Sequence, residues 1–250
     1  MNGSRSILFS AALLSLAAVS ACSDATGTRR VPLSLSFATK SFAAKASVSS
    51  PVGFSADLIV GTGKDLVLIS AQVVVDGIEL SHDNGPNCEG TGEFQCENVE
   101  QAPQLVVLQL NANTPKTQLT VAVPEGSYER LDAHIRVPEN GAVSGDAALM
   151  SFLAANPGKS VKVTGTYKGQ TFEYTAPIDA QLELRFNPPF VVTSTAKNIT
   201  VDVDVASWFT DSSGAALDPT ASANAATIVA NIRKSFNAIE DDNKDGEVDQ

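Results

Sequence analysis

Apolar and polar side chains alternate one by one along much of this chain of 250 residues. The clearest runs are residues 130–137 (RLDAHIRV) and 199–205 (ITVDVDV), in which every second side chain is apolar. Successive side chains of a β-strand point to opposite faces of a sheet, so this alternation is typical of strands with one face on a core and the other in water. The pattern therefore predicts a chain that folds mainly as β-strands.

Further stretches have the same strand-like character, namely residues 33–37, 54–60, 66–81, 104–110, 117–123, 160–167, 170–177 and 182–187. Turn signals separate them, such as Asn140-Gly141, Lys168-Gly169 and Pro188-Pro189. About ten short strands at this spacing, with few helices between them, favour an all-β fold, an antiparallel β-sandwich.

Two helices are expected to interrupt the strands. Asp146 to Ala155, ended by Asn156-Pro157-Gly158, predicts a short connecting helix between the two halves of the sandwich. Ser222 to Ile239 predicts a C-terminal amphipathic helix that packs on a sheet. Its apolar stripe consists of Ile228, Val229, Ile232, Phe236 and Ile239.

The N-terminus has the features of an export signal. Arg5 precedes an uncharged apolar run from Ile7 to Val19, which is shorter than the ~20 residues needed to cross a bilayer. Val19-Ser20-Ala21-Cys22 resembles the lipobox of bacterial lipoproteins, which implies cleavage before Cys22 and lipidation of that cysteine. Ser23 after it, by resemblance to Gram-negative sorting rules, favours the outer membrane. The alternative is a simple secretory signal with Cys22 as an ordinary thiol.

These features divide the chain into four parts. Residues 1–21 are expected to be a lipoprotein signal peptide, 22–31 a lipidated tether, 32–219 the β-sandwich domain, and 220–250 the C-terminal helix and an acidic tail. Two or more acyl chains hold a protein at a membrane lastingly, whereas one is marginal. Whether 32–219 forms one sandwich or two small domains stays open.

Charge limits the partners of this protein. The chain has 28 acidic and 17 basic side chains, a net charge of −11. Binding to nucleic acid or anionic headgroups relies on Lys and Arg, so both are poor partners for this chain and no nucleic-acid partner is expected. The expected partners are the membrane, through the lipid anchor, and an unknown protein or glycan.

Cys88 and Cys96 lie in a loop rich in Gly, Asn and Glu between two strand-like stretches. In an exported chain a disulfide between them is the default expectation, stabilising the loop by roughly 2 to 3 kcal/mol in the chain-entropy model. The alternative is a zinc site, which needs two further ligands, and His82 is the only candidate nearby.

The stretch from Leu66 through Val137, with "ISAQVVVDGIEL", "LVVLQL" and "VPEGSYERLDAHI", resembles a family of bacterial surface lipoproteins that carry a domain of unknown function. Its most telling piece is Gly126-Ser127-Tyr128 after a valine-proline turn. The segment Asn198 to Pro219 is similar to what such lipoproteins often carry. The resemblance implies an immunoglobulin-like or prealbumin-like sandwich and an envelope location, and it implies no chemistry.

The C-terminus resembles the front of an EF-hand or dockerin-type calcium loop, in which oxygen ligands alternate along a turn and Gly246 permits its bend. The bidentate Glu of the twelfth position is missing and no exiting helix follows. One interpretation is a weak calcium site, with the low affinity of extracellular calcium-binding modules. The alternative is a solvated acidic tail that only keeps the protein soluble. The candidate ligands are Asp241, Asn243, Asp245, Glu247 (through its carbonyl) and Asp249.

Motifs for catalysis are missing from the sequence: there is no Gly-x-Ser-x-Gly elbow, no His-Glu-x-x-His and no phosphate-binding glycine loop. His82 beside a loop and His134 on a polar strand face are expected to be surface residues. Asp202 and Asp204 are expected to point outward together, and with Trp208 nearby they suggest a sugar site.

The alternative for the two carboxylates is an ordinary exposed strand face, and Trp208 and Phe209 are more typical of core plugs at a sandwich end. The leading hypothesis is therefore a non-catalytic binding or adhesion module whose loops, including the loop between Cys88 and Cys96, contact the partner. The alternatives are a structural envelope protein stabilised by calcium and a hydrolase with an unrecognised site.

Overall fold

The computed structural model describes residues 30–39, 58–61, 63–82, 99–110, 115–139, 145–195 and 197–244. In these parts the chain is mostly β-strand, as the alternation predicts, and no helix among them is long and apolar enough to cross a membrane. The elements are β1 Arg30–Thr39, β2 Leu58–Val60, β3 Leu66–His82, β4 Val99–Gln101, β5 Gln104–Leu108, β6 Lys116–Pro124, β7 Gly126–Ile135, α1 Ala147–Ala155, β8 Val161–Tyr167, β9 Gln170–Ala176, β10 Ala180–Val192, β11 Lys197–Val203, the 3-10 helices η2 Val205–Phe209 and η3 Ser222–Asn224, α2 Ala225–Lys234 and β12 Phe236–Glu240.

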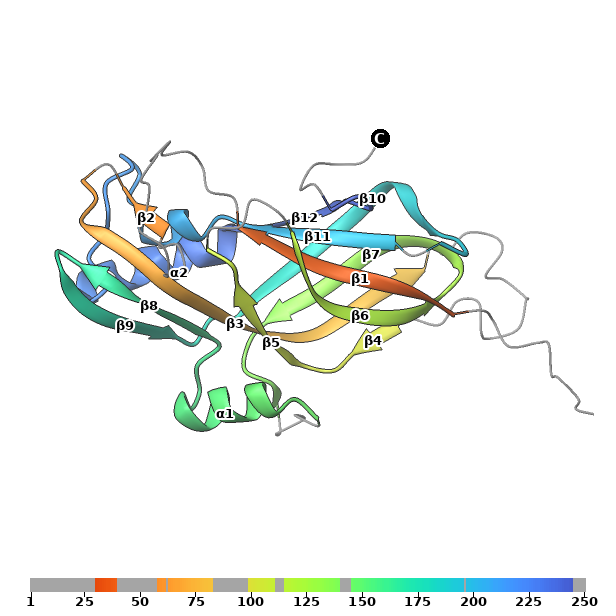
Figure 1. Ribbon diagram of the computed structural model, residues 1–250, viewed down its shortest axis with the longest axis horizontal. Helices are drawn as coiled ribbons and strands as arrows, with labels where there is room; N and C mark the ends of the chain where they lie inside the picture. Colours follow the sequence, from red (N-terminus) through yellow and green to blue (C-terminus); the bar gives the residue numbers. More distant parts are fainter. Residues whose placement is uncertain are drawn as a thin grey trace, which may run out of the picture.

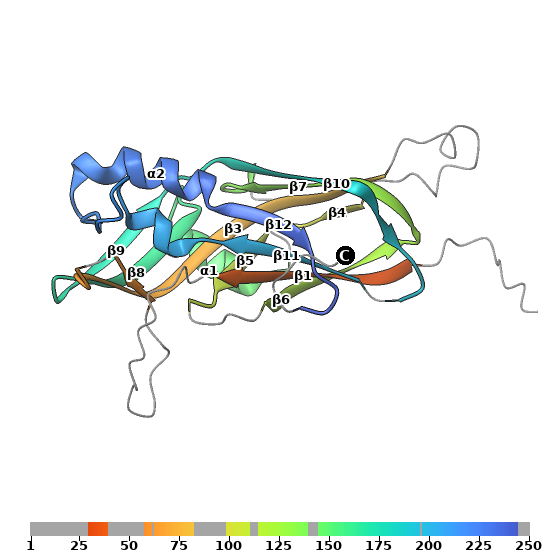
Figure 2. The ribbon, with the colours of Figure 1, turned by 90° about the horizontal axis from the view of Figure 1, so that it is seen from above.

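The strands form two sheets that face each other, so the predicted all-β sandwich is confirmed (Figures 1 and 2). The smaller sheet has the order β12-β11-β1-β6, and the larger sheet is built around the long strand β3. The described pairs are antiparallel with one exception, since β1 runs parallel to β11. That parallel pair places the first described strand beside one of the last.

The strand β3 organises the larger sheet because it is long enough to pair with several strands in succession. Val75 pairs with both β5 and β7, and Ala71 pairs with both β5 and β8. The strands β8 and β7 therefore follow one another along the edge of β3 that lies opposite β5. Between Asp76 and Glu79 the register with β7 shifts, and Gly77 there has a φ of 63°, a conformation that glycine adopts without steric cost.

The core lies between the sheets. From the smaller sheet it takes every second side chain of β1 and β11, for example Leu35, Phe37 and Val201, all less than a tenth exposed. Trp208 and Phe209, on η2, are fully buried, and the Phe209 ring packs edge-on against Tyr174 with centroids 5.5 Å apart. The interpretation of Trp208 and Phe209 as core plugs is thus confirmed.

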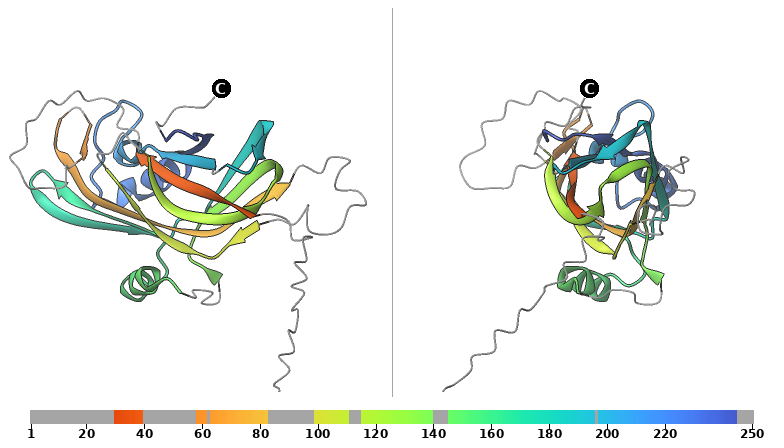
Figure 3. Two further views of the ribbon diagram at one scale, coloured as in Figure 1. Left: turned by 45° about the vertical axis from the view of Figure 1, so that its right-hand side comes forward. Right: turned by 90° about the vertical axis from the view of Figure 1, so that its right-hand side faces the viewer.

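The helix α1 begins and ends as predicted. The carboxylate of Asp146 accepts hydrogen bonds from the amides of Ala148 and Leu149, which caps the helix. Leu149 and Phe152 pack on Val74, on the outer face of the larger sheet. Figure 3 shows α1 projecting from the side of the molecule opposite β12. It joins β7 to β8, the two strands that share one edge of β3.

The second predicted helix is too long. It ends at Lys234, and Phe236–Glu240 is the strand β12, antiparallel to β11. Ile228 and Ile232 are buried, and Phe236 and Ile239 follow them at intervals of four and three residues. This spacing suits one face of a helix, which is why the sequence predicts a longer one. Residues 236–240 form a strand because they pair with the edge of β11, which satisfies their backbone hydrogen bonds. The same pairing places Phe236 against the core.

Candidate binding groove between two edge strands

The sandwich is open along one side, where an edge of the larger sheet faces an edge of the smaller sheet. In the described part of the chain β10 pairs only with β7, and β12 pairs only with β11. Some Cα atoms of β10 and β12 lie within 8 Å of each other, although the two strands do not pair. The opening between them leads into the core, and we call it the β10/β12 groove.

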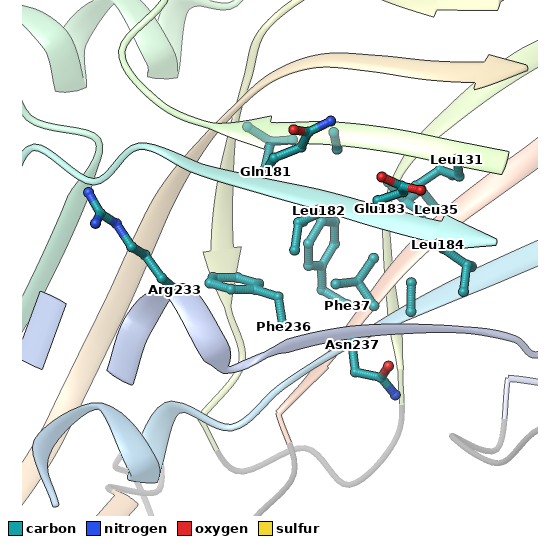
Figure 4. Close-up of a pocket in the computed structure, with 14 residues that line it drawn as sticks. Leu35, Phe37, Leu131, Gln181, Leu182, Glu183, Leu184, Arg233, Phe236 and Asn237 are labelled. Atoms are coloured by element: carbon teal, nitrogen blue, oxygen red, sulfur yellow. The ribbon is translucent and has the colours of Figure 1, made fainter. Parts of the chain in front are cut away.

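The β10/β12 groove holds an open cavity of about 180 Å³, whose exposed surface is polar and apolar in about equal parts although most of the lining residues are apolar. Its floor is formed by β1 and β7, and its walls by β10 on one side and β12 on the other. Figure 4 shows Leu182, Phe37 and Phe236 gathered in the space between the strands. The apolar lining consists of Leu35, Phe37, Val75, Leu131, Ala133, Leu182, Leu184, Val201, Phe236 and Ala238.

The cavity exists because the two walls bring too little side-chain volume to close it. Along β10, Leu182 and Leu184 point inward but stay partly exposed. Opposite them, β12 contributes Ala238, whose methyl group leaves space that a larger side chain would fill. The apolar surface that lines the groove is therefore reachable by solvent, which is the condition for binding an apolar ligand.

The mouth of the groove is polar. Gln181 and Glu183 line it from β10, and Asn237 and Arg233 from β12 and the end of α2. Glu183 is neutralised by Arg185, whose Nε lies 2.6 Å from its carboxylate. Arg233 is exposed and makes no ion pair within the described ranges. Figure 4 shows its guanidinium on the β10 side of the opening.

Trp208, the one tryptophan of the chain, stands directly behind the groove. Its ring centroid lies 6.1 Å from that of Phe236, and its indole nitrogen donates a 2.6 Å hydrogen bond to the hydroxyl of Ser235. Ser235 in turn donates to the carbonyl of Ile232 in α2. A ligand that contacts Phe236 would therefore alter the surroundings of Trp208, and the fluorescence of Trp208 would report it.

The structure corrects the expectation for His82. This side chain is buried at the end of β3, where Nδ1 lies 3.1 Å from the carbonyl oxygen of Ser127. Nε2 is also buried and has no hydrogen-bond partner within the described ranges. Burial lowers the pKa of His82, and the hydrogen bond to Ser127 opposes this shift. The ring is neutral because its charged form would lose hydration.

The neighbours of His82 explain the Gly-Ser-Tyr sequence that the family resemblance emphasises. Tyr128 lies against the imidazole ring and donates its hydroxyl to the carbonyl of Pro124 at 2.8 Å. Burial raises the pKa of Tyr128 to about 12. A Cβ on Gly126 would lie 2.7 Å from Cε1 of His82, so only glycine fits there. The three residues form a packed corner between β6 and β7.

His134 lies on β7 and is partly exposed, as expected for a polar strand face. Its partner in the register is Asp76, whose carboxylate lies 2.5 Å from Nε of Arg136. Neither His134 nor His82 lines the groove. The structure therefore does not place a histidine where the apolar cavity would bind a ligand.

The expectation that Asp202 and Asp204 point outward together is wrong. Asp202 is only 3% exposed, and Asp204 lies beyond the end of β11, where its carboxylate caps η2 by accepting from the amide of Ser207 at 3.1 Å. The alternation is genuine, but both faces of β11 are buried, including Thr200 on its polar face. Trp208 is fully buried, so the suggested sugar site is not formed.

The start of the acidic C-terminus docks on the same polar face. Asp241 is fully buried, and its carbonyl accepts a 2.7 Å hydrogen bond from the side-chain amide of Asn198. The carboxylate of Asp242 accepts from the backbone amide of Asn198 at 3.0 Å and from the ammonium group of Lys197. Asn243 is exposed. Asp241 is therefore part of the folded body, not of a solvated tail.

The other predicted site residues lie outside the described residues: Cys22, Cys88, Cys96, Asp245, Glu247 and Asp249. Within the described part, no three His, Cys, Asp or Glu side chains gather in a way that could hold a metal ion. The groove itself gave no signal in the sequence, because it is made by two strands that are not adjacent in the chain.

Known protein families contain no match to this chain, and no curated protein matches it. Among solved structures the chain is similar to MbnP from Methylosinus trichosporium, with a TM-score of 0.41 and 15% sequence identity. The similarity covers 78% of this chain and 82% of that chain. A likeness this distant assigns neither a family nor a function.

Proposed function

We propose that this protein is a lipid-anchored protein of the bacterial cell envelope, held at the outer membrane, that acts as a non-catalytic binding module. The observation that carries the binding role is the cavity of the β10/β12 groove, which is lined by apolar and polar side chains and opens to solvent on the side of the sandwich. The signal-like N-terminus and the lipobox resemblance at Cys22 support the location.

The lining of the groove favours binding over catalysis. Side chains such as Leu182, Leu184 and Phe236 offer apolar contact, and burying apolar surface contributes roughly 25 cal/mol per Å². Nucleophilic hydrolysis needs a hydroxyl or thiol beside an oriented base, and the lining holds neither a serine nor a histidine. The polar groups at the mouth are suited to orienting a ligand.

The edges of the groove also exclude a bound peptide strand between β10 and β12. A strand inserted between two others needs them about 9.6 Å apart, twice the ~4.8 Å spacing of neighbouring strands. Some Cα atoms of β10 and β12 are closer than 8 Å. Pro188 and Pro189 on β10 lack the amide hydrogens with which an edge recruits a further strand. The occupant is therefore narrower than a strand.

The fluorescence of Trp208 tests the binding role, with 1-hexanol as a neutral apolar probe. We expect a saturable change in emission, since the probe would contact Phe236, against which Trp208 packs. The variant Ala238→Phe fills the cavity and should abolish the change. The matched control is Ala154→Phe, which places the same ring at an exposed position of α1.

The outcome is read together with thermal melting of both variants. A folded Ala238→Phe variant that responds to 1-hexanol like the unmodified protein would show that the β10/β12 groove is not the site. The absence of any saturable response in the unmodified protein, checked by calorimetry, would remove the binding role of this groove altogether.

A second candidate function is structural, with calcium at the acidic C-terminus. Asp241, the first residue of the calcium-loop pattern, is anchored on β11 through Asn198, which would give the loop a fixed starting point. Asp202 is buried on the same face of β11. Calcium bound there would stabilise the junction between β11, β12 and the residues that follow.

A further inference from the structure

We propose that the β10/β12 groove selects a small anionic amphiphile, with a carboxylate held by Arg233 and a single short apolar chain or ring in the cavity. This inference rests on the proposed binding role of the groove and adds the chemical class of the ligand. Three observations carry it: the charge at the mouth, the volume of the cavity and the width of the opening.

The charge at the mouth is positive where the ligand would enter. Arg233 lines the cavity and has no ion-pair partner within the described ranges, whereas Glu183 is already paired with Arg185 at 2.6 Å. A guanidinium group has a planar array of donors that matches a carboxylate in a bidentate manner. An anion is therefore the charge that this opening prefers.

The volume limits the apolar part. A cavity of about 180 Å³ is close to the ~150 Å³ of a dry apolar cavity that binds benzene. A six-carbon chain or one aromatic ring fits, whereas the two long chains of a phospholipid do not. A free small carboxylate is the occupant that satisfies charge and volume together.

The width and the polarity gradient agree with this ligand. Some Cα atoms of β10 and β12 lie within 8 Å of each other, so the opening is too narrow for anything wider than an alkyl chain or a flat ring edge-on. Along the groove, the lining changes from Arg233 to Phe236 and then to Phe37. An amphiphile placed with its charged group outward keeps the carboxylate hydrated on one side and avoids burying an unpaired charge.

Three probes of equal chain length test the inference at pH 7.5: hexanoate, 1-hexanol and hexylammonium. Binding is measured by the fluorescence of Trp208 and by calorimetry on the mature full-length protein. Since Arg233 is exposed, we expect hexanoate to bind about two- to fivefold more tightly than 1-hexanol, the range of exposed ion pairs. Hexylammonium should bind more weakly than 1-hexanol.

Variants of Arg233 test whether its positive charge causes the preference for hexanoate. Arg233→Gln should make hexanoate and 1-hexanol bind equally, and Arg233→Lys should keep part of the preference. The matched control is Lys234→Gln, which removes a neighbouring exposed charge that does not line the cavity, and it should keep the preference. Melting temperatures verify that each variant is folded.

The failures of the two proposals are distinguishable. If none of the three probes binds, the groove is not a binding site and the proposed function fails with it. If 1-hexanol binds as tightly as hexanoate, or Arg233→Gln leaves the preference unchanged, the binding role stands and the choice of an anion is overturned.

Discussion

The imidazole ring of His82 packs on the phenol ring of Tyr128, with centroids 4.2 Å apart and planes tilted by 33°. The two side chains come from β3 and β7 and are paired in the register of the larger sheet. Gly126 leaves the space that the imidazole occupies. This contact fixes the corner where β6 turns into β7, and it makes two predictions about stability.

Gly126→Ala should destabilise the fold. The new methyl group would lie 2.7 Å from Cε1 of His82, too close for any carbon contact, so the imidazole ring or the corner must shift. Overpacking of this kind costs roughly 1–3 kcal/mol, measured as the free energy of unfolding in urea. Gly63→Ala is the control, because its Cβ meets only the flexible carboxylate of Asp65 at 3.3 Å. Equal stability of the two variants would contradict the packed corner.

The stability should fall with acid in a window that His82 defines. Burial lowers the pKa of His82 in the folded state below its ordinary value of 6.5, so the unfolded chain binds a proton first as the pH falls. The stabilisation is therefore fully present above pH 6.5 and is lost as the pH drops from there through the folded-state pKa. Unfolding in urea at several pH values between 8 and 5 measures this slope.

The control for this pH dependence is a pair of glutamine variants. His82→Gln removes the titrating group and should flatten the slope between pH 7 and pH 5, whereas Lys159→Gln, at a residue that does not titrate in this range, should leave the slope as it is. A slope that persists in His82→Gln would mean that carboxylates, not this histidine, govern acid stability.

The alternation was sufficient to predict the sandwich, because strands that share a core carry their apolar side chains at every second position. It predicted residues 130–135 of β7 and 199–203 of β11, while it missed the first residues of each strand and extended two residues past each end. It could not predict whether the polar face of a strand meets solvent, and Asp202 shows the consequence, since a carboxylate expected outside is buried. The period reports which residues share a face, but not what covers that face.

Two other features had no usable local signal. The spacing of Ile232, Phe236 and Ile239 suits a helix, and only the unpaired edge of β11 turns Phe236–Glu240 into a strand. The β10/β12 groove depends on how far apart two sheet edges lie, so Arg233 looked like any polar residue on an amphipathic helix. Features made by long-range pairing need the structure.

The proposed lipid anchor makes a prediction that is independent of the fold. Cells that express the full chain should incorporate labelled palmitate into it, and Cys22→Ser should abolish the label, since acylation requires that thiol. Cys88→Ser is the matched control and should stay labelled. Membrane fractionation of the same cells should move the Cys22→Ser protein out of the membrane fraction. A label that persists in Cys22→Ser would remove the lipoprotein proposal.

Calcium should raise the melting temperature if the acidic C-terminus binds it. A site of the extracellular type has a dissociation constant of about 1 mM, so calcium at about 10 mM stabilises by ~1.4 kcal/mol. For a chain of this size the shift corresponds to about 3–6 °C relative to a chelator. Asp245→Ala removes a predicted ligand and should abolish the shift, whereas the exposed Glu173→Gln should keep it. An unchanged melting temperature at this calcium concentration would leave Asp241 as a packing residue of β11 and β12 that is hydrogen-bonded to Asn198.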